Sequence, residues 1–318
     1  MTRCIYASMT RGVHDERWVK ALRGIGIDVA AISRVDFPSD SAFEGHVASE
    51  ASRVDFVIAG PLEWARQVAE QAGSVVLLSW GFDLQDAEAE QLDLQGFTAV
   101  IVDSTANRQI AEEHGARKIL LIPWGVDIDA MNRGTGAADL SPFGVARSER
   151  VVLSLRAHEE LYRVADIIEA FAMTNTDARL VIGNSGSLTS QLQDQVHSLG
   201  IDATFIPAVA EDEVPALLRR SSVYVTASRV DGTSVTLLQA MACGVPVVAS
   251  VNSGNADWVE DGVTGFMFPV GDAAALANAI QRALDNGDSV KEAALAQVRE
   301  RADWNRNVHQ LQKFLTKP

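Results

Sequence analysis

The stretch SRVDGTSVTLLQAMACGVPVVAS, from Ser228 to Ser250, decides the fold. It begins where an apolar run predicts the end of a strand. Gly232-Thr233-Ser234 then opens an apolar helix that leads into a second strand. Small residues let the backbone approach a ligand closely, and the free N–H groups at a helix start favour a diphosphate. Asp231 can cap this helix or accept hydrogen bonds from a sugar hydroxyl, although the local pattern alone also fits an ordinary capped core helix.

Strand-like and helical segments alternate along almost the whole chain on both sides of that stretch. Apolar runs rich in Val, Ile and Leu, such as DFVIAG and KILLIPW, predict strands buried on both faces, and their alternation with helices predicts parallel sheets. Residues 134–150 break this rhythm and predict a linker. We therefore expect an α/β protein of two Rossmann-like domains, residues 1–140 and 150–300. A last helix at 303–318 should pack back toward the first domain.

Composition narrows the class of protein. The net charge of −15 argues against nucleic-acid binding and against electrostatic docking on an anionic membrane. Cys4 and Cys243 are the two cysteines of the sequence, and neither has a neighbour at the spacing of a thiolate zinc site. Two reduced thiols suit a cytoplasmic protein. With no charged leader before an apolar run and no apolar stretch of about 20 residues, we expect neither a signal peptide nor an integral membrane segment.

The segment DGTSVTLLQAMACGVPVVAS resembles the signature of glycosyltransferase family 4, retaining enzymes of the GT-B fold that use nucleotide sugars. The resemblance implies two Rossmann-like domains facing each other across a cleft, with the donor held mainly by the second. The acidic positions of the family's Glu-x7-Glu pattern fall on Asp231 and Gln239. Gln239 departs from the family, because an amide still bonds the ribose hydroxyls but loses the charge-assisted bond. The donor-binding helix start implied here comprises Gly232, Thr233, Ser234 and Val235.

The segment VVLSLRAHEELYRVADIIEAF is similar to the family's phosphate-binding element of strand, Arg, loop, Lys and helix. The resemblance implies that Arg156 binds the donor phosphate, whereas the residue alone would also fit a surface salt bridge. The family's Lys falls on Tyr162, and Arg163 follows it. Either Arg163 supplies the second cation or one cation holds the phosphates. Arg156, Arg163 and Asp231 are thus the catalytic candidates.

Two further segments resemble the parts of the family that surround the nucleotide. IGNSG, at 182–186, resembles the loop that lies under the nucleotide and implies a contact at Gly183. TFIPAV, at 204–209, resembles the strand whose backbone reads the base edge and implies a contact at Pro207. Main-chain contacts of this kind do not name the base.

The first half of the chain resembles the family less densely. MTRGVHDERWVKALRGIGIDV is similar to the family's opening segment, which implies that Gly12 approaches the donor diphosphate. His14 has three interpretations: a donor or acceptor contact, a helix-start cap and a surface residue. SWGFDLQD resembles the family's WGxD segment and implies that Trp80 and Asp83 lie at the cleft mouth, on the acceptor side.

The chemistry implied is displacement of a nucleoside diphosphate from a sugar by a hydroxyl of a small-molecule or glycan acceptor. Arg156 and the helix amides would stabilise the leaving phosphate. We expect no cofactor beyond the donor sugar. We also expect no metal, because no Asp-x-Asp or His cluster offers a clear cation site. The sequence leaves open whether the protein forms a homo-oligomer. One alternative, favoured by Tyr162 and Gln239, is a non-catalytic glycosyltransferase-like protein that binds a nucleotide sugar or another protein. Another is a nucleotide-sugar epimerase, whereas a nicotinamide oxidoreductase lacks its G-x-G-x-x-G after the first strand.

Overall fold

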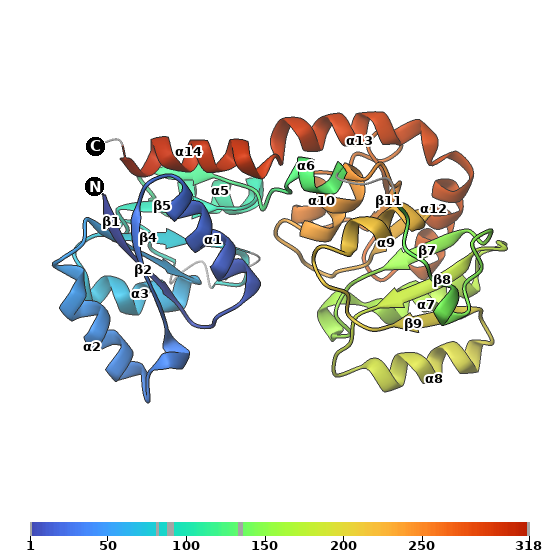
Figure 1. Ribbon diagram of the computed structural model, residues 1–318, viewed down its shortest axis with the longest axis horizontal. Helices are drawn as coiled ribbons and strands as arrows, with labels where there is room; N and C mark the ends of the chain where they lie inside the picture. Colours follow the sequence, from blue (N-terminus) through green and yellow to red (C-terminus); the bar gives the residue numbers. More distant parts are fainter. Residues whose placement is uncertain (1, 81–82, 88–91, 133–135, 317–318) are drawn as a thin grey trace. The chain divides into compact units, whose positions relative to one another are not determined.

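The computed structural model of the chain describes residues 2–80, 83–87, 92–132 and 136–316. It forms two compact units, one comprising Met1–Pro123 with Trp304–Pro318 and the other Trp124–Asp303. Each unit contains one six-stranded sheet in which every strand pair is parallel (Figure 1). The prediction of an α/β protein with two parallel sheets is confirmed.

The sheet of the first unit has the strand order β2-β1-β3-β4-β5-β6. Its strands are β1 (Arg3–Ser8), β2 (Asp28–Ser33), β3 (Phe56–Gly60), β4 (Val75–Leu78), β5 (Ala99–Val102) and β6 (Ile119–Leu121). Its helices are α1 (Val13–Gly24), α2 (Asp40–Ala51), α3 (Leu62–Gln71), α4 (Asp83–Asp86), α5 (Thr105–Glu113) and α14 (Trp304–Thr316), with a 3-10 turn at Arg34–Asp36. Strands β3, β4 and β5 are buried along their whole length, as their apolar runs predict.

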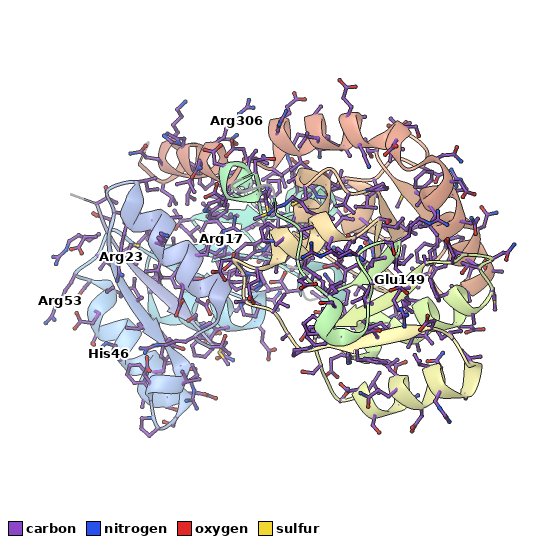
Figure 2. The ribbon with its side chains drawn as sticks, turned by 45° about the vertical axis from the view of Figure 1, so that its right-hand side comes forward. Arg17, Arg23, His46, Arg53, Glu149 and Arg306 are labelled. Carbon is purple, nitrogen blue, oxygen red and sulfur yellow. The ribbon has the colours of Figure 1, made fainter. Side chains whose placement is uncertain are left out.

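The last helix, α14, packs within the first unit although it follows the second unit in sequence. The Trp304 ring stands edge-on to Trp18, with 5.6 Å between the ring centroids. The guanidinium of Arg17, labelled in Figure 2, lies 4.2 Å from the centroid of the Trp304 ring. Farther along the helix, Lys118 Nζ donates a hydrogen bond to the Phe314 carbonyl at 2.8 Å. Aromatic and cation–π contacts therefore attach α14 to α1.

The sheet of the second unit has the order β12-β11-β10-β7-β8-β9. Its strands are β7 (Val151–Ser154), β8 (Arg179–Gly183), β9 (Ala203–Ile206), β10 (Val223–Thr226), β11 (Val247–Ser250) and β12 (Phe266–Phe268). Its helices are α6 (Ile128–Asn132), α7 (Val164–Ala172), α8 (Thr189–Leu199), α9 (Val214–Arg220), α10 (Val235–Ala242), α11 (Ser253–Ala256), α12 (Ala273–Asn286) and α13 (Asp288–Arg301). Short 3-10 turns occupy Ser141–Phe143 and Glu160–Tyr162.

Alternate residues of these strands enter two separate apolar layers. Val151 and Leu153 of β7 belong to one buried cluster, which includes α10 and α13. Val152, between them, belongs to the other, which includes α7 and α12. Helices thus cover both faces of the sheet, so its functional edge is the one where the carboxyl ends of the strands emerge.

The stretch predicted as a linker lies inside the second unit, because the chain divides between Pro123 and Trp124. Residues 133–135 of that stretch fall outside the described ranges. Farther along, Leu140 and Val145 are buried in the cluster that contains Val151. These two apolar residues attach a Gly- and Ser-rich segment to the core, together with hydrogen bonds such as that from Ala138 N to the Ala216 carbonyl, and the polar composition concealed them.

Candidate functional site

The second unit has a topological switch point between β7 and β10. From β7 the chain continues to β8 and β9 on one side of the sheet, whereas from β10 it continues to β11 and β12 on the other. In open parallel sheets, ligands bind in the crevice outside the carboxyl ends of the strands at such a point. Arg156 follows the carboxyl end of β7, and Asp231 follows that of β10. The sheet order therefore brings together two residues that are far apart in sequence.

Arg156 and Asp231 form an ion pair at this point. Arg156 Nη2 donates to Asp231 Oδ2 at 2.8 Å, and Nη1 donates to Ser234 Oγ at 3.0 Å. The two charged side chains are only 11% and 15% exposed. The Tyr162 ring stacks on the guanidinium, with its centroid 4.2 Å from the Arg156 Cζ. The pair is therefore not the surface salt bridge that the sequence alone left open.

The charge of Arg156 persists in this buried setting. Burial acts to lower the pKa of Arg156, but the carboxylate of Asp231 and the nearby Tyr224 and Tyr162 act to raise it, and the net pKa is raised. Burial raises the pKa of Tyr224, the residue of β10 beside the arginine, to about 12. At neutral pH the site thus contains a fixed positive charge and a neutral phenol.

The loop between β10 and α10 is held by a close approach of two backbones. A Cβ added to Gly254 would lie 1.7 Å from the Gly232 carbonyl oxygen and 2.3 Å from that of Asp231, so only glycine fits there. Ser234 is the N-cap of α10 and makes no side-chain cap bond. The capping role considered for Asp231 is therefore wrong, because its carboxylate binds Arg156 instead.

The start of α10 carries the other donor-binding candidates. Thr233, Ser234 and Gln239 are all buried. The N–H groups of the first helical turn, which begins at Val235, have no partner inside the helix. Gln239 lies on the second turn, and no residue within the described ranges forms a hydrogen bond with its side-chain amide. These buried polar groups converge on the helix end that lies beside Arg156.

The loop after β8 packs tightly and is fixed by a residue that the sequence did not single out. A Cβ on Gly183 would lie 2.6 Å from Leu155 Cδ2, so this loop packs closely against the Leu155 side chain. Glu159 accepts hydrogen bonds from Ser187 N at 2.7 Å and Ser187 Oγ at 2.5 Å, and these bonds lower the pKa of Glu159. Pro207, directly after β9, is exposed at the same edge of the sheet.

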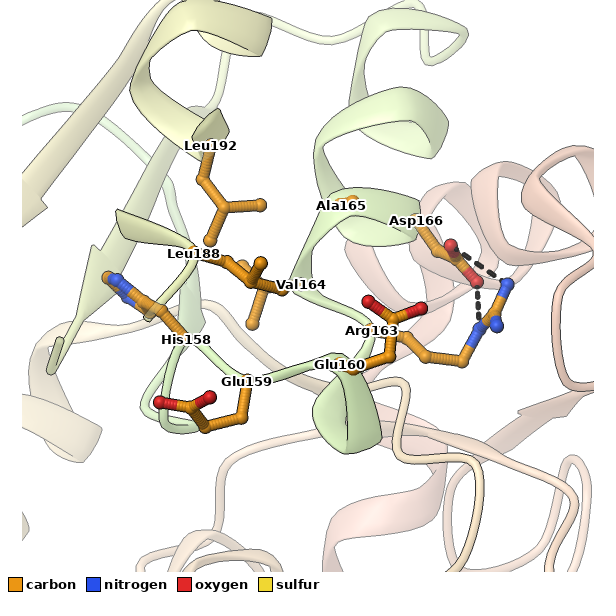
Figure 3. Close-up of a pocket in the computed structure, with 9 residues that line it drawn as sticks. All are labelled: His158, Glu159, Glu160, Arg163, Val164, Ala165, Asp166, Leu188 and Leu192. Carbon is orange, nitrogen blue, oxygen red and sulfur yellow. Dashed lines mark hydrogen bonds and ion pairs between the residues drawn. The ribbon is translucent and has the colours of Figure 1, made fainter. Parts of the chain in front are cut away.

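Arg163 has a different partner from Arg156. It adopts a left-handed backbone conformation, with φ 49°, at the start of α7. Its guanidinium binds Asp166 through two hydrogen bonds, at 2.6 and 3.1 Å (Figure 3). A shallow pocket is lined by both residues together with His158, Leu188 and others. Arg163 forms its ion pair with Asp166, and among the described residues Arg156 is the cation that pairs with Asp231 at the switch point.

In the first unit, the loop after β1 is organised around Asp15. The Asp15 carboxylate accepts a hydrogen bond from Gly12 N at 2.8 Å and another from Tyr6 Oη at 3.1 Å. Gly12 is the N-cap of α1, and the side chain of His14, two residues later in the first turn, is exposed. The sequence did not single out Asp15, although an acidic residue at the third position after a cap is a recognisable signal.

Asp83 is likewise bound within its own unit. Its carboxylate accepts hydrogen bonds from Ser79 Oγ at 2.5 Å, Leu62 N at 2.9 Å and Leu84 N at 2.8 Å. Burial raises its pKa, and these bonds offset part of that effect. Trp80 is half-buried nearby, whereas the Gly and Phe that complete the predicted motif, residues 81–82, lie outside the described residues. Asp83 thus joins the loops that follow β3 and β4.

The described residues contain neither a metal-binding cluster nor a membrane-spanning helix. No group of three or more His, Cys, Asp or Glu side chains in these ranges is placed to hold a metal ion. Among the same residues, no helix combines the length and apolar composition that crossing a membrane requires.

The sequence profile of the family described as glycosyl transferases group 1 matches residues 140–304, just over half of the chain. The chain belongs to this family. The match covers both members of the ion pair and the whole of α10. The glycosyl transferases group 1 assignment therefore rests on the unit that contains the switch-point site.

Curated relatives of this glycosyl transferases group 1 chain have names of the same kind. It is 29% identical over 166 residues to N-acetyl-alpha-D-glucosaminyl L-malate synthase of Bacillus anthracis, covering 49% of this chain and 44% of the relative. It is 30% identical over 232 residues to D-inositol 3-phosphate glycosyltransferase of Geodermatophilus obscurus, covering 66% of this chain and 51% of the relative. The chain thus spans about half the length of these relatives.

Solved structures match the chain over nearly its full length. The Anabaena protein HepE, crystallised with UDP and glucose, has a TM-score of 0.83 at 18% identity, covering 99% of this chain and all of HepE. Sucrose-phosphate synthase of Thermosynechococcus elongatus has a TM-score of 0.81 at 17% identity, covering 99% and 98%. At this identity the likeness shows the fold, and the predicted GT-B fold is confirmed.

Proposed function

We propose that this chain is a retaining glycosyltransferase of family 4 that moves a sugar from a nucleoside-diphosphate sugar to an acceptor hydroxyl. The observation that carries the proposal is Arg156, a buried cation at the switch point, 3.0 Å from the N-cap of α10. A buried positive charge beside a helix start forms an anion site, and a diphosphate is the anion that this family's chemistry releases. Names and bound ligands of the relatives support the proposal, since they include glycosyltransferases and a UDP complex.

In the proposed reaction, the acceptor hydroxyl forms a bond to the anomeric carbon as the bond to the diphosphate breaks. The bonding electron pair leaves with the phosphate oxygen, and a donor phosphate oxygen takes the proton of the acceptor. Arg156 and the amides from Gly232 to Val235 would stabilise the charge that develops on the leaving oxygen. Asp231 and Gln239 would bind sugar and ribose hydroxyls.

We further propose that no protein-bound metal takes part, because Arg156 and the helix start supply the positive charge that a metal ion would otherwise provide. Gly12, Gly183 and Pro207 stay predicted donor contacts, and His14 and Trp80 predicted acceptor contacts. Cytoplasmic location also stays a proposal, supported by the two cysteines, which are unpaired.

Turnover assays with uridine, guanosine and adenosine diphosphate sugars test this proposal. L-malate and inositol 3-phosphate, which the names of relatives contain, belong among the acceptors tried. Replacing Arg156 by alanine should reduce turnover about 100-fold or more, the scale of one lost charge-stabilising donor. Arg282→Ala is the matched control, because Arg282 forms a half-exposed pair with Asp261 in the same unit. Near-normal turnover of Arg156→Ala would contradict the placement of the phosphates, and NMR of the product would decide retention.

A second candidate function is nucleotide-sugar binding without transfer. The observation in its favour is Tyr162, which occupies the place of the family's lysine and stacks on Arg156 instead of supplying a second cation. Binding of a nucleotide sugar, measured by calorimetry, with no turnover in the presence of any acceptor or of water would support this alternative over transfer.

A further inference from the structure

The two members of the switch-point ion pair differ in how firmly they are held. Arg156 is held by the Ser234 hydroxyl and by the stacked Tyr162 ring, and its Nε is buried without a hydrogen-bond partner among the described residues. Asp231 has a single hydrogen-bond partner for its carboxylate, which is Arg156 Nη2. Its second oxygen, Oδ1, accepts no hydrogen bond from any residue that the structure describes. The carboxylate is therefore the partner that can turn away.

The backbone that carries this carboxylate is fixed. Gly254 approaches the carbonyl oxygens of Asp231 and Gly232 so closely that no Cβ fits between them. The carboxylate itself can move about the two side-chain torsions of Asp231. These torsions allow the carboxylate to leave Arg156 and to meet a ligand while the loop stays in place.

Charge determines which ligand would make that exchange. In the structure, Asp231 neutralises Arg156, so the pair has no net charge to offer an anion. A phosphate that approaches Arg156 meets a carboxylate 2.8 Å from the same guanidinium and is repelled by it. A free nucleoside diphosphate carries its hydrogen-bond donors on the ribose and base, and its ionised phosphates offer the displaced carboxylate none. A nucleotide sugar offers its sugar hydroxyls, which donate to carboxylates.

We propose that Asp231 makes the site discriminate between a nucleotide sugar and the free nucleoside diphosphate. Asp231 weakens binding of the free nucleoside diphosphate because it neutralises Arg156. With the nucleotide sugar, hydrogen bonds from the sugar hydroxyls to Asp231 offset the loss of the ion pair. The inference rests on the proposed function, in which the first ligand is the donor and the second is the product. In a catalytic cycle the free diphosphate would then be released faster, because the sugar has been transferred to the acceptor before the diphosphate dissociates.

Calorimetric titration of the whole chain with UDP and with UDP-glucose tests the inference, and the guanosine and adenosine pairs replace them if the uridine pair does not bind. Asp231→Asn keeps the size of the side chain and removes its charge. The dissociation constant of UDP should fall about tenfold, the effect of one nearby charge, while that of UDP-glucose should change less than about threefold. The ratio of the UDP dissociation constant to the UDP-glucose dissociation constant should therefore decrease in Asp231→Asn. Unchanged or weaker UDP binding by Asp231→Asn would overturn the inference.

Asp261→Asn is the matched control, because Asp261 pairs with Arg282 at 3.1 Å in the same unit. Its UDP affinity should stay within about twofold of the unaltered chain, since a pair away from the switch point has no bound phosphate to repel. Equal tightening by both variants would show a bulk charge effect and would also overturn the inference. Asp231→Glu, which retains the charge, should retain weak UDP binding.

The outcomes separate this inference from the proposed function. If the unaltered chain binds none of the nucleotides or nucleotide sugars, both fail. If it binds them and Arg156→Ala abolishes binding, but Asp231→Asn leaves the ratio of the two dissociation constants unchanged, only the role of Asp231 fails.

Discussion

Both units contain a six-stranded parallel sheet, but the carboxylates near the carboxyl ends of the strands have different partners in the two units. In the first unit, Asp15 and Asp83 accept hydrogen bonds from backbone N–H groups and hydroxyls of their own unit. In the second unit, Asp231 binds a buried cation across the switch point. A carboxylate saturated by its own loop holds that loop in shape, whereas a carboxylate with one cationic partner can exchange it for a ligand. The residue type and its position at the sheet edge are the same in both units. Only the hydrogen-bond and ion-pair partners of each carboxylate distinguish the two roles.

The largest expected difference between the units concerns two glycines that lie against backbone. A Cβ on Gly254 would be 1.7 Å from the Gly232 carbonyl oxygen, and a Cβ on Gly60 would be 2.0 Å from that of Leu78. Gly254→Ala should displace the loop that carries Asp231 and weaken nucleotide binding at least tenfold, as well as reducing stability by about 1–3 kcal/mol. Calorimetry and chemical denaturation measure the two effects.

Gly60→Ala is the matched variant in the first unit. It should cost similar stability, about 1–3 kcal/mol, because the same kind of backbone clash arises. Its nucleotide affinity, measured on the folded fraction, should stay within about twofold, because the loops after β3 and β4 hold no cation in the described structure. If Gly60→Ala and Gly254→Ala lost nucleotide affinity equally, the predicted difference between the two units would be wrong.

The pH dependence of stability provides a second, smaller test. Burial raises the pKa of Asp83, so the folded protein holds that proton more tightly than the unfolded chain does. The free energy of unfolding should therefore fall as the pH rises from the ordinary aspartate value of about 4 through the raised value, and then level. Asp83→Asn, which does not titrate, should lack this decline. Urea denaturation across that pH range measures it, and an identical slope in both proteins would contradict the assignment.

The smallest expected effect concerns the two stacked arginines. Arg156 on Tyr162 and Arg17 on Trp304 have the same separation, 4.2 Å. Tyr162→Ala should weaken nucleotide binding about twofold to thirtyfold, because a cation–π contact contributes about 0.5–2 kcal/mol, whereas Tyr162→Phe should retain it. Arg17→Ala should reduce stability slightly and leave nucleotide affinity unchanged. Weakened binding in Tyr162→Phe would show that the hydroxyl contacts the ligand and that stacking is not the main contribution.

Much of the fold could be predicted because its signals are local. Apolar runs such as VVLSL and SVYVTAS became β7 and β10, since strands buried on both faces need continuous apolar sequence. The pairing of Arg156 with Ser234 and Asp231 could not be read from spacing, because 75 residues or more separate the partners and only the sheet order joins them. The resemblance to a family supplied the candidates, and the fold supplied the contact.

Other features escaped because sequence pattern does not reveal partners. Arg163 and Arg156 look equivalent in the motif, but Asp166, three residues on, binds Arg163. Glu159 had no signal of its own, since it acts on Ser187 across a loop. The segment at 134–150 read as a linker because two apolar anchors in a polar stretch are too few to form a period.

The sequence by itself determined the alternation of strands and helices, the family and the residues at the start of α10, because these depend on contacts between near neighbours. The tertiary structure alone decided the division after Pro123, the buried state of Arg156 and the partner of each carboxylate. Burial and charge pairing depend on contacts between segments that are distant in sequence. The order of the parallel strands determines which of those segments are in contact. The same residue type therefore joins loops in one unit and pairs with a buried cation in the other.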